Sequence, residues 1–229
     1  MNNRQYLTEE RGYPPYRLRH RTKTTQVLRS TDPDMIPAVF AAIQRNEVII
    51  LPTDTVYGVG TNAFDEDAVR CLFVVKQRAR EKGIPILIAD ISDLEKIAID
   101  IPPVANKLIA RFWPGPLTLV LPKRPDLPPA ISNSNYVAVR LPDHNVCREI
   151  IRAAGGALAT TSANLSGRAP AQTVDEALRE LAGAVTLAVD DGPSGGQVAS
   201  TVVECTRDMI RILRSGPLAM EDLLQVEQS

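Results

Sequence analysis

Hydroxyl and amide side chains gather in the segment 160–167, which reads Thr-Thr-Ser-Ala-Asn-Leu-Ser-Gly. This segment follows the strand-like run 156–159, so it predicts donors and acceptors at the end of a strand, where open α/β sheets bind ligands. A polar turn with Gly167 as its left-handed residue would also explain these residue types. Taken alone, the segment leaves both interpretations open.

Two further segments have the same polar character. The sequence PTDTVYG at 52–58 follows the apolar run 48–51, and Lys76-Gln-Arg78 follows a predicted helix. By themselves, Lys76 and Arg78 are typical of a solvated helix end, whose dipole favours cations. The three segments together indicate one site with hydroxyls, an amide and two cations, which suits a phosphate-bearing substrate and a small polar one.

Several other kinds of chemistry do not fit the sequence. It has no G-x-x-x-x-G-K-[ST] motif, and the G-x-G-x-x-A match at 58–63 lies too far after its preceding strand for dinucleotide binding. Of the two histidines, His144 is expected in the first turn of a helix, with a capping or solvated role. No cluster has metal-ligand spacing, so we expect no tightly bound metal. Without a clear general base, the sequence favours charge stabilisation and positioning, as in phosphoryl or nucleotidyl transfer.

Length and composition favour a soluble protein with one main domain. The chain has 229 residues, of which 44% are hydrophobic and 23% charged. Three scattered cysteines without a C-x-x-C motif indicate reduced thiols near the core, and we expect a cytoplasmic protein with no membrane span. Residues 1–25 form a basic N-terminal extension with six basic and two acidic side chains, a composition typical of salt-sensitive contact with nucleic acid, and residues 26–229 form the main domain.

The predicted elements alternate between strands and helices. Strands are expected at 26–29, 48–51, 85–89, 118–121, 137–140, 156–159, 185–189, 200–204 and 209–213. Helices are expected to begin at Asp32, Asp65, Pro102, Asp143 and Thr173. The first should bury Ile36, Val39, Phe40 and Ile43 on one face, and the last should open with a capping box to Glu176. This alternation predicts a three-layer α/β sheet, with antiparallel pairs near the C-terminus.

Seven motifs in order resemble the YrdC family of threonylcarbamoyl-adenylate synthases over roughly residues 26–224. They read PTDTVYGVG, KQR with a following KG, FWPGPLT, VAVRLPDH, TSANLSG, DDGP…STVV and ILRSG. The resemblance implies a twisted mixed sheet, flanked by helices, with a wide basic cleft. It also implies a cytoplasmic nucleotidyltransferase that makes threonylcarbamoyl-AMP and pyrophosphate from L-threonine, bicarbonate or CO2, and ATP with Mg²⁺, for threonylcarbamoyladenosine modification of tRNA.

The resemblance also implies residue roles. Lys76 and Arg78 match the family's Lys-x-Arg pair, Ser162 and Asn164 match its Ser-x-Asn pair, and the four would be catalytic. The implied ATP-binding residues are Lys76, Arg78, Lys82, Asn164 and Arg214. The implied threonine-binding residues are Thr53, Thr55, Arg140, Thr161 and Ser200. A guanidinium such as that of Arg140 can hold a carboxylate with two hydrogen bonds.

The chain departs from the family pattern in three places. Ala79 stands where a proline commonly follows Lys-x-Arg, and Ala89 stands where longer relatives have a histidine. The extra domain of long relatives is not expected after Leu224, which implies separate partner proteins for transfer to tRNA. Two alternatives stay open: a non-catalytic RNA-binding module of this fold, or a paralogue of another activity, such as forming carbamoyl-adenylate without threonine. The intact Lys-x-Arg and Ser-x-Asn pairs favour the synthase.

Overall fold

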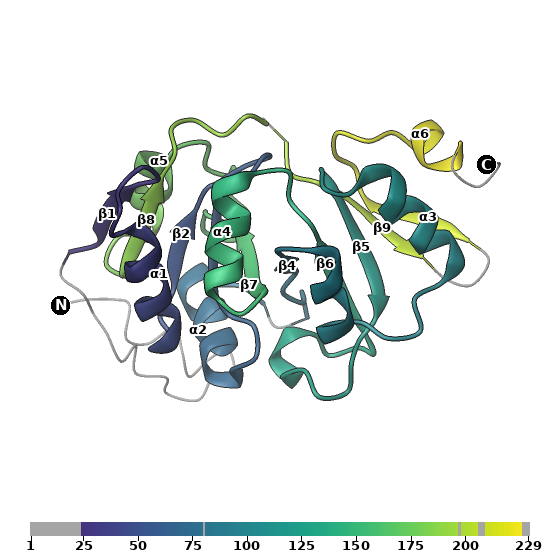
Figure 1. Ribbon diagram of the computed structural model, residues 1–229, viewed down its shortest axis with the longest axis horizontal. Coiled ribbons are helices and arrows are strands. Elements are labelled where there is room, and N and C mark those ends of the chain that lie inside the picture. Colours follow the sequence, from purple (N-terminus) through teal and green to yellow (C-terminus); the bar gives the residue numbers. More distant parts are fainter. Residues whose placement is uncertain (1–23, 80, 197, 206–208, 226–229) are drawn as a thin grey trace.

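A computed structural model describes residues 24–225 of the chain, except residues 80, 197 and 206–208 (Figure 1). Of the predicted N-terminal extension, residues 1–23 lie outside the described residues. No helix in the described range is long and apolar enough to cross a membrane. Cys147 and Cys205 are buried, and Cys71 is partly buried.

A single ten-stranded sheet runs through the described part, in the order β1-β8-β2-β3-β7-β4-β6-β5-β9-β10 (Figure 1). Its strands are β1 (Gln26–Arg29), β2 (Ile49–Leu51), β3 (Gly58–Asn62), β4 (Ile86–Ile88), β5 (Leu117–Pro122), β6 (Tyr136–Arg140), β7 (Ala157–Ser162), β8 (Leu187–Asp190), β9 (Thr201–Cys205) and β10 (Ile210–Arg214). The sheet is mixed. Antiparallel pairs were expected near the C-terminus, where β9 pairs with β10, but they also occur elsewhere in the sheet. They join β2 to β3, β3 to β7, β7 to β4 and β5 to β6.

Helices cover both faces of this sheet, which confirms the predicted three layers. They are α1 (Met35–Gln44), α2 (Glu66–Lys76), α3 (Pro103–Phe112), α4 (Asn145–Ala153), α5 (Val174–Leu181) and α6 (Met220–Leu224), with 3₁₀ turns η1 (Ile91–Lys96) and η2 (Pro129–Ile131). Side chains of α1 and α4 pack with Leu51, Leu87 and Leu158 in one core cluster. Side chains of α2, α3 and α5 pack in a second, larger cluster with the opposite side of the strands.

Helix α1 begins later than the sequence predicts. Asp32 does not cap it; its carboxylate accepts the amide of Asp34 at 2.9 Å in the turn before the helix, which starts at Met35. The buried stripe of α1 is therefore Met35, Val39, Ala42 and Ile43, and Phe40, predicted to be buried, is 51% exposed.

Asp65 and Thr173 are N-caps as predicted, and the helix expected from Asp143 is capped one residue later, by His144. The carboxylate of Asp65 accepts the amide of Ala68 at 2.8 Å, and Nδ1 of His144 accepts that of Cys147 at 3.3 Å. Thr173 accepts the amide of Glu176 at 3.2 Å, but the Glu176 carboxylate accepts from Gln172, so only half of the predicted capping box forms. These caps depend on short-range contacts, which is why the sequence could indicate them.

Strand β3 is the strand that the sequence analysis missed, and the short helix α6 and the 3₁₀ turns η1 and η2 were not predicted either. Its residues are those of the weak G-x-G match, and they lie between β2 and β7 as a central strand that is paired on both sides. A Cβ at Gly60 would come within 2.8 Å of the Leu158 side chain, so this position requires glycine for close packing. The register places Leu51, Gly58 and Ser162 side by side across the three strands, and so brings segment 52–57 next to the end of β7.

Candidate active site

Lys76 lies on the buried face of α2, at its last residue, and is only 1% exposed. The helix ends here because Gln77 adopts a left-handed conformation with φ 50°. The ammonium of Lys76 donates to Oδ1 of Asn164 at 3.0 Å and to the carbonyl oxygen of Ser162, and lies 3.5 Å from the Ser162 hydroxyl. A solvated helix end is therefore the wrong interpretation of Lys76, because the end of β7 and the turn after it cover its side chain.

The burial of Lys76 disfavours its charged form. Burial and the nearby charge of Arg78 lower the pKa of Lys76 to about 7, and the carboxylate of Glu180 acts in the opposite direction. The three acceptor oxygens around Nζ favour the ammonium form, so the site holds a cation that an anionic ligand would stabilise further.

Arg78 holds the loop that follows α2. Its Nε donates to the carbonyl of Lys82 at 3.0 Å, and one terminal nitrogen donates to the carbonyl of Gly83 at 2.9 Å. Burial and the charge of Arg214 lower the pKa of Arg78. The side chain of Lys82, an expected ATP contact, is exposed to solvent. The structure thus brings Lys76, Arg78, Ser162 and Asn164 to one place, as the sequence predicts.

Asn164 is buried and bound mainly to the protein. Its amide nitrogen donates to the carbonyls of Leu165 at 3.1 Å and Arg168 at 2.6 Å, while its oxygen accepts from Lys76. The resemblance implies a catalytic and ATP-binding role for Asn164, which stays a prediction. Its observed contacts orient Lys76 and close the turn 164–168, so the side chain is also part of the protein's own packing.

Arg140 forms a second cluster with the segment after β2. Its guanidinium donates to the carbonyl of Gly115 at 2.9 Å, to the hydroxyl of Thr55 at 2.8 Å and to the carboxylate of Asp54 at 2.5 Å. The hydroxyls of Thr53 and Thr55 lie 3.1 Å apart. The predicted residues Thr53, Thr55 and Arg140 therefore meet. Asp54 was missed, although a buried arginine generally requires a carboxylate partner.

Ser200 and Arg214 form the third cluster, beside β9. Arg214 donates to the Ser200 carbonyl at 2.7 and 3.1 Å and to its hydroxyl at 3.1 Å. The Ser200 hydroxyl also shares a hydrogen bond of 2.7 Å with Thr118, a buried residue that the sequence analysis did not select. Thr161, another expected threonine contact, is partly buried on β7 beside Val59.

Electrostatic interactions join these clusters into one group of cations. The charge of Arg78 lowers the pKa of Lys76, that of Arg214 lowers the pKa of Arg78, and that of Arg140 lowers the pKa of Arg214. Like charges that act on one another destabilise one another, and a bound polyanion would relieve this repulsion. In the described range, no group of three His, Cys, Asp or Glu side chains could hold a metal ion.

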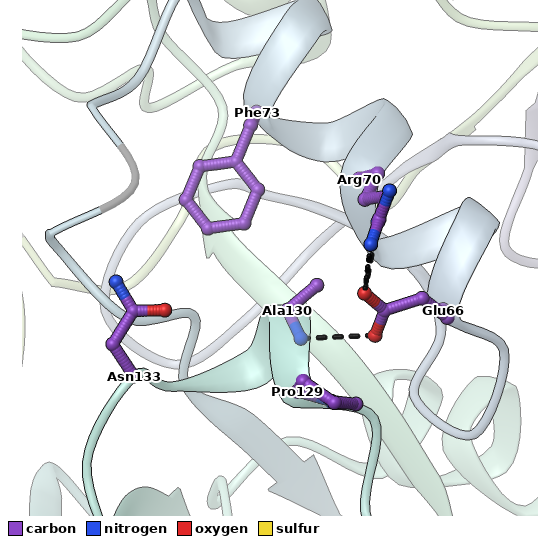
Figure 2. A pocket seen from close by; sticks show the side chains of 6 residues that line it. All are labelled: Glu66, Arg70, Phe73, Pro129, Ala130 and Asn133. Carbon is purple, nitrogen blue, oxygen red and sulfur yellow. Dashed lines mark hydrogen bonds and ion pairs between the residues drawn. The ribbon is translucent and has the colours of Figure 1, made fainter. Parts of the chain in front are cut away.

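A small pocket of about 130 Å³ lies elsewhere on α2 (Figure 2). Glu66, Arg70 and Phe73 line it from the helix, and Pro129, Ala130 and Asn133 line it from η2 and the residues after it. The Glu66 carboxylate accepts from Arg70 at 2.8 Å and from the Ala130 amide at 2.9 Å. None of the predicted site residues lines this pocket, so it is separate from the cation group.

The mixed sheet, covered by helices on both faces, defines an α/β protein in which Lys76, Arg78, Arg214 and Arg140 act on one another's charges. A family model for Sua5, YciO and YrdC, described as "Telomere recombination", matches residues 41–216, and the chain belongs to this family. The resemblance and the fold class expected from the sequence are confirmed.

Two curated relatives show how much of the chain is shared. The chain is 39% identical over 201 residues to a threonylcarbamoyl-AMP synthase of Bacillus subtilis, covering 87% of this chain and 58% of the relative. It is 35% identical over 207 residues to a putative threonylcarbamoyl-AMP synthase of Mycobacterium tuberculosis, covering 88% and 95%. The chain therefore spans little more than half of the first relative and nearly all of the second.

Solved structures give the same result at the level of the fold. Pyrococcus abyssi Sua5 complexed with L-threonine matches with a TM-score of 0.83 and 35% identity, covering 88% of this chain and 60% of that one. Escherichia coli YciO matches with a TM-score of 0.78 and 21% identity, covering 88% and 100%, which supports the fold alone.

Proposed function

We propose that this chain is a threonylcarbamoyl-AMP synthase. It would make L-threonylcarbamoyladenylate and pyrophosphate from L-threonine, bicarbonate or CO2, and ATP. The observation that carries the proposal is the continuous group of cations from Lys76 through Arg78 and Arg214 to Arg140, which ends beside the paired hydroxyls of Thr53 and Thr55. The names of the relatives from Bacillus subtilis and Mycobacterium tuberculosis support the same activity.

The two ends of this group suit different parts of the substrates. Lys76 and Arg78 would bind the triphosphate and stabilise the charge that develops on the leaving pyrophosphate. Ser162 lies beside Lys76 and would help to orient the phosphates. Arg214, whose charge lowers the pKa of Arg78, would contact the nucleotide, as would the exposed Lys82.

The other end suits the amino acid. Three of the five N–H donors of Arg140 bind Gly115, Thr55 and Asp54, and the other two would bind the carboxylate of the amino acid. The hydroxyls of Thr53 and Thr55 would bind the threonine hydroxyl, with Thr161 and Ser200 completing the pocket. Pyrococcus abyssi Sua5, whose structure holds L-threonine, supports the assignment of threonine as substrate.

The reaction needs positioning more than proton transfer by the protein. The threonine amine adds to CO2 and loses a proton, which gives a carbamate. A carbamate oxygen attacks the α-phosphorus of ATP, the bond to the bridging oxygen breaks, and pyrophosphate leaves. Mg²⁺ would arrive with ATP and neutralise part of the phosphate charge. The adenylate would then pass to separate proteins that transfer the threonylcarbamoyl group to tRNA.

Pyrophosphate release from ATP tests the proposal directly. We expect release to require both L-threonine and bicarbonate, and mass spectrometry should detect the threonylcarbamoyl-adenylate. Release that proceeds equally without threonine would indicate a paralogue of another activity. No release under any condition, together with tight tRNA binding, would favour the RNA-binding module.

A further inference from the structure

Glu180 of α5 lies behind the turn 164–168 that covers Lys76. Its Oε2 accepts the amide of Leu165 at 2.6 Å, and its Oε1 lies 3.5 Å from a terminal nitrogen of Arg168. The Glu180 side chain is 20% exposed, so much of this carboxylate is withdrawn from water. Glu180 thus contacts both ends of the turn. Neither the motifs nor the resemblance selected it.

The same turn holds Lys76 at two points. The amide of Ser166 donates to the carbonyl oxygen of Lys76 at 3.0 Å, and Oδ1 of Asn164 accepts from its ammonium at 3.0 Å. Asn164 is fixed in turn by its 2.6 Å hydrogen bond to the carbonyl of Arg168. A continuous set of hydrogen bonds therefore runs from Glu180 through the turn to both ends of Lys76.

Glu180 also acts on the charge of Lys76. In the described residues, the charged groups that act on Lys76 are Arg78, which lowers its pKa, and Glu180, which raises it. Arg168 faces Glu180 from the outer side of the turn, with its own side chain 64% exposed. Glu180 is therefore the carboxylate that opposes both the burial of Lys76 and its repulsion by Arg78.

We propose that Glu180 is a positioning residue for the Lys76 ammonium. It holds the turn 164–168 in place through the Leu165 amide, and its negative charge keeps Lys76 protonated without touching the substrate. The inference rests on the proposed function to the extent that Lys76 is taken to bind the triphosphate.

Two variants of Glu180 separate its geometric role from its electrostatic role. Glu180→Gln keeps an oxygen that can accept the Leu165 amide but removes the charge, whereas Glu180→Ala removes both. Glu176→Gln is the matched control, because Glu176 lies one turn earlier on α5 and also accepts a backbone amide, that of Gln172, at 2.7 Å. Glu176 is not among the groups that shift the pKa of Lys76.

The first measurement is kcat/KM for ATP across the pH range 6–9. Because the pKa of Lys76 is about 7, removing the Glu180 charge moves the loss of the ammonium to lower pH. The deficit of Glu180→Gln should therefore be smallest at pH 6 and increase towards pH 8, by about tenfold for each unit that the pKa falls. Glu180→Ala should add a loss in kcat of about 10–10² at every pH, since misplacing a catalytic group by about 1 Å can cost 10²-fold.

Glu176→Gln should stay within about twofold of wild type throughout, as is usual for a substitution away from the site. A Glu180→Gln profile parallel to that of wild type would overturn the electrostatic role. Equal losses in Glu176→Gln and Glu180→Gln would show that both act only through the stability of α5.

A second measurement does not depend on activity. NMR of protein labelled with ¹³C,¹⁵N-lysine, with the Lys76 signal assigned by its loss in Lys76→Arg, gives the titration midpoint of Lys76 without substrate. We expect a lower midpoint in Glu180→Gln and an unchanged one in Glu176→Gln. A lowered midpoint in a protein without threonine-dependent ATP turnover would refute the proposed function and leave this inference standing. An unchanged midpoint in an active enzyme would overturn this inference alone.

Discussion

The buried charge of Lys76 should make the free energy of unfolding rise with pH, and the variant Lys76→Met should lack this part of the pH dependence. The pKa of Lys76 is about 7 in the folded protein, against 10.5 for an ordinary lysine. Between these values the unfolded chain binds more protons than the folded one, so the free energy of unfolding rises with pH. Below pH 7 the folded state carries the full cost of the buried ammonium.

The size of this effect follows from the difference between the two pKa values. Each unit corresponds to about 1.4 kcal/mol, so the whole difference amounts to about 5 kcal/mol as an upper bound. From pH 7 to pH 9, the unfolding free energy of wild type should rise by about 2–3 kcal/mol relative to that of Lys76→Met. The hydrogen bonds lost in Lys76→Met shift this difference by a constant and do not change its slope.

Urea denaturation at several pH values measures this slope. Trp113 is the single tryptophan of the chain and is buried, with its indole nitrogen 2.7 Å from the carbonyl of Leu117, so its fluorescence should report unfolding. Lys107→Met removes an exposed lysine from α3 and serves as the control, whose difference from wild type should stay constant. Parallel pH profiles for wild type and Lys76→Met would refute the argument that this charge is buried at a cost.

Three further predictions concern catalysis and substrate choice. Arg78→Ala should lower the kcat of pyrophosphate release by about 10²–10³. Arg78→Lys should restore only part of this kcat, because an ammonium cannot form the two parallel hydrogen bonds of a guanidinium. A normal kcat in both variants would contradict a role of Arg78 at the phosphates. Asn164→Ala should lower kcat and should also reduce the free energy of unfolding, measured in urea, by about 1–3 kcal/mol, because two carbonyls of the turn lose their donor. Unchanged stability would contradict the structural role of Asn164. The kcat/KM for serine should be lower than that for threonine by a factor that corresponds to about 1–3 kcal/mol. The kcat/KM for valine should be lower still, because valine lacks the hydroxyl. Equal rates with all three amino acids would exclude threonine as the selected substrate.

Much of the fold follows from local patterns in the sequence. The caps at Asp65 and Thr173 and the apolar runs of β2 and β4 depend on residues close together in the chain, and each was predicted. Strand β3 was not, because Gly-Val-Gly-Thr-Asn has neither an apolar run nor a clear alternation. It is a strand because β2 and β7 pair with it on both sides, and no local pattern shows those partners.

The same distinction separates the parts of the site that were predicted from those that were missed. Residues in recognisable polar segments, such as Ser162 and Thr55, could be selected from the sequence. The burial of Lys76 could not, because its ammonium is covered by residues about 86 positions further along the chain. Asp54 and Glu180 were missed for a related reason: a carboxylate is ordinary in sequence, and only its partner in space reveals its role.

The two missed carboxylates lie at opposite ends of the cation group. Asp54 pairs with Arg140 beside the hydroxyls of Thr53 and Thr55, and the charge of Glu180 opposes the repulsion of Lys76 by Arg78. The repulsion along the group, from Lys76 to Arg140, therefore has a counter-charge from the protein at each end. Between them lie Arg78 and Arg214, whose pKa values are lowered by burial and by each neighbouring cation in turn. An anionic ligand would relieve the repulsion among these cations. On the proposed function, the amino acid would bind at the Asp54 end, and the phosphates would extend from Arg78 and Arg214 towards Lys76.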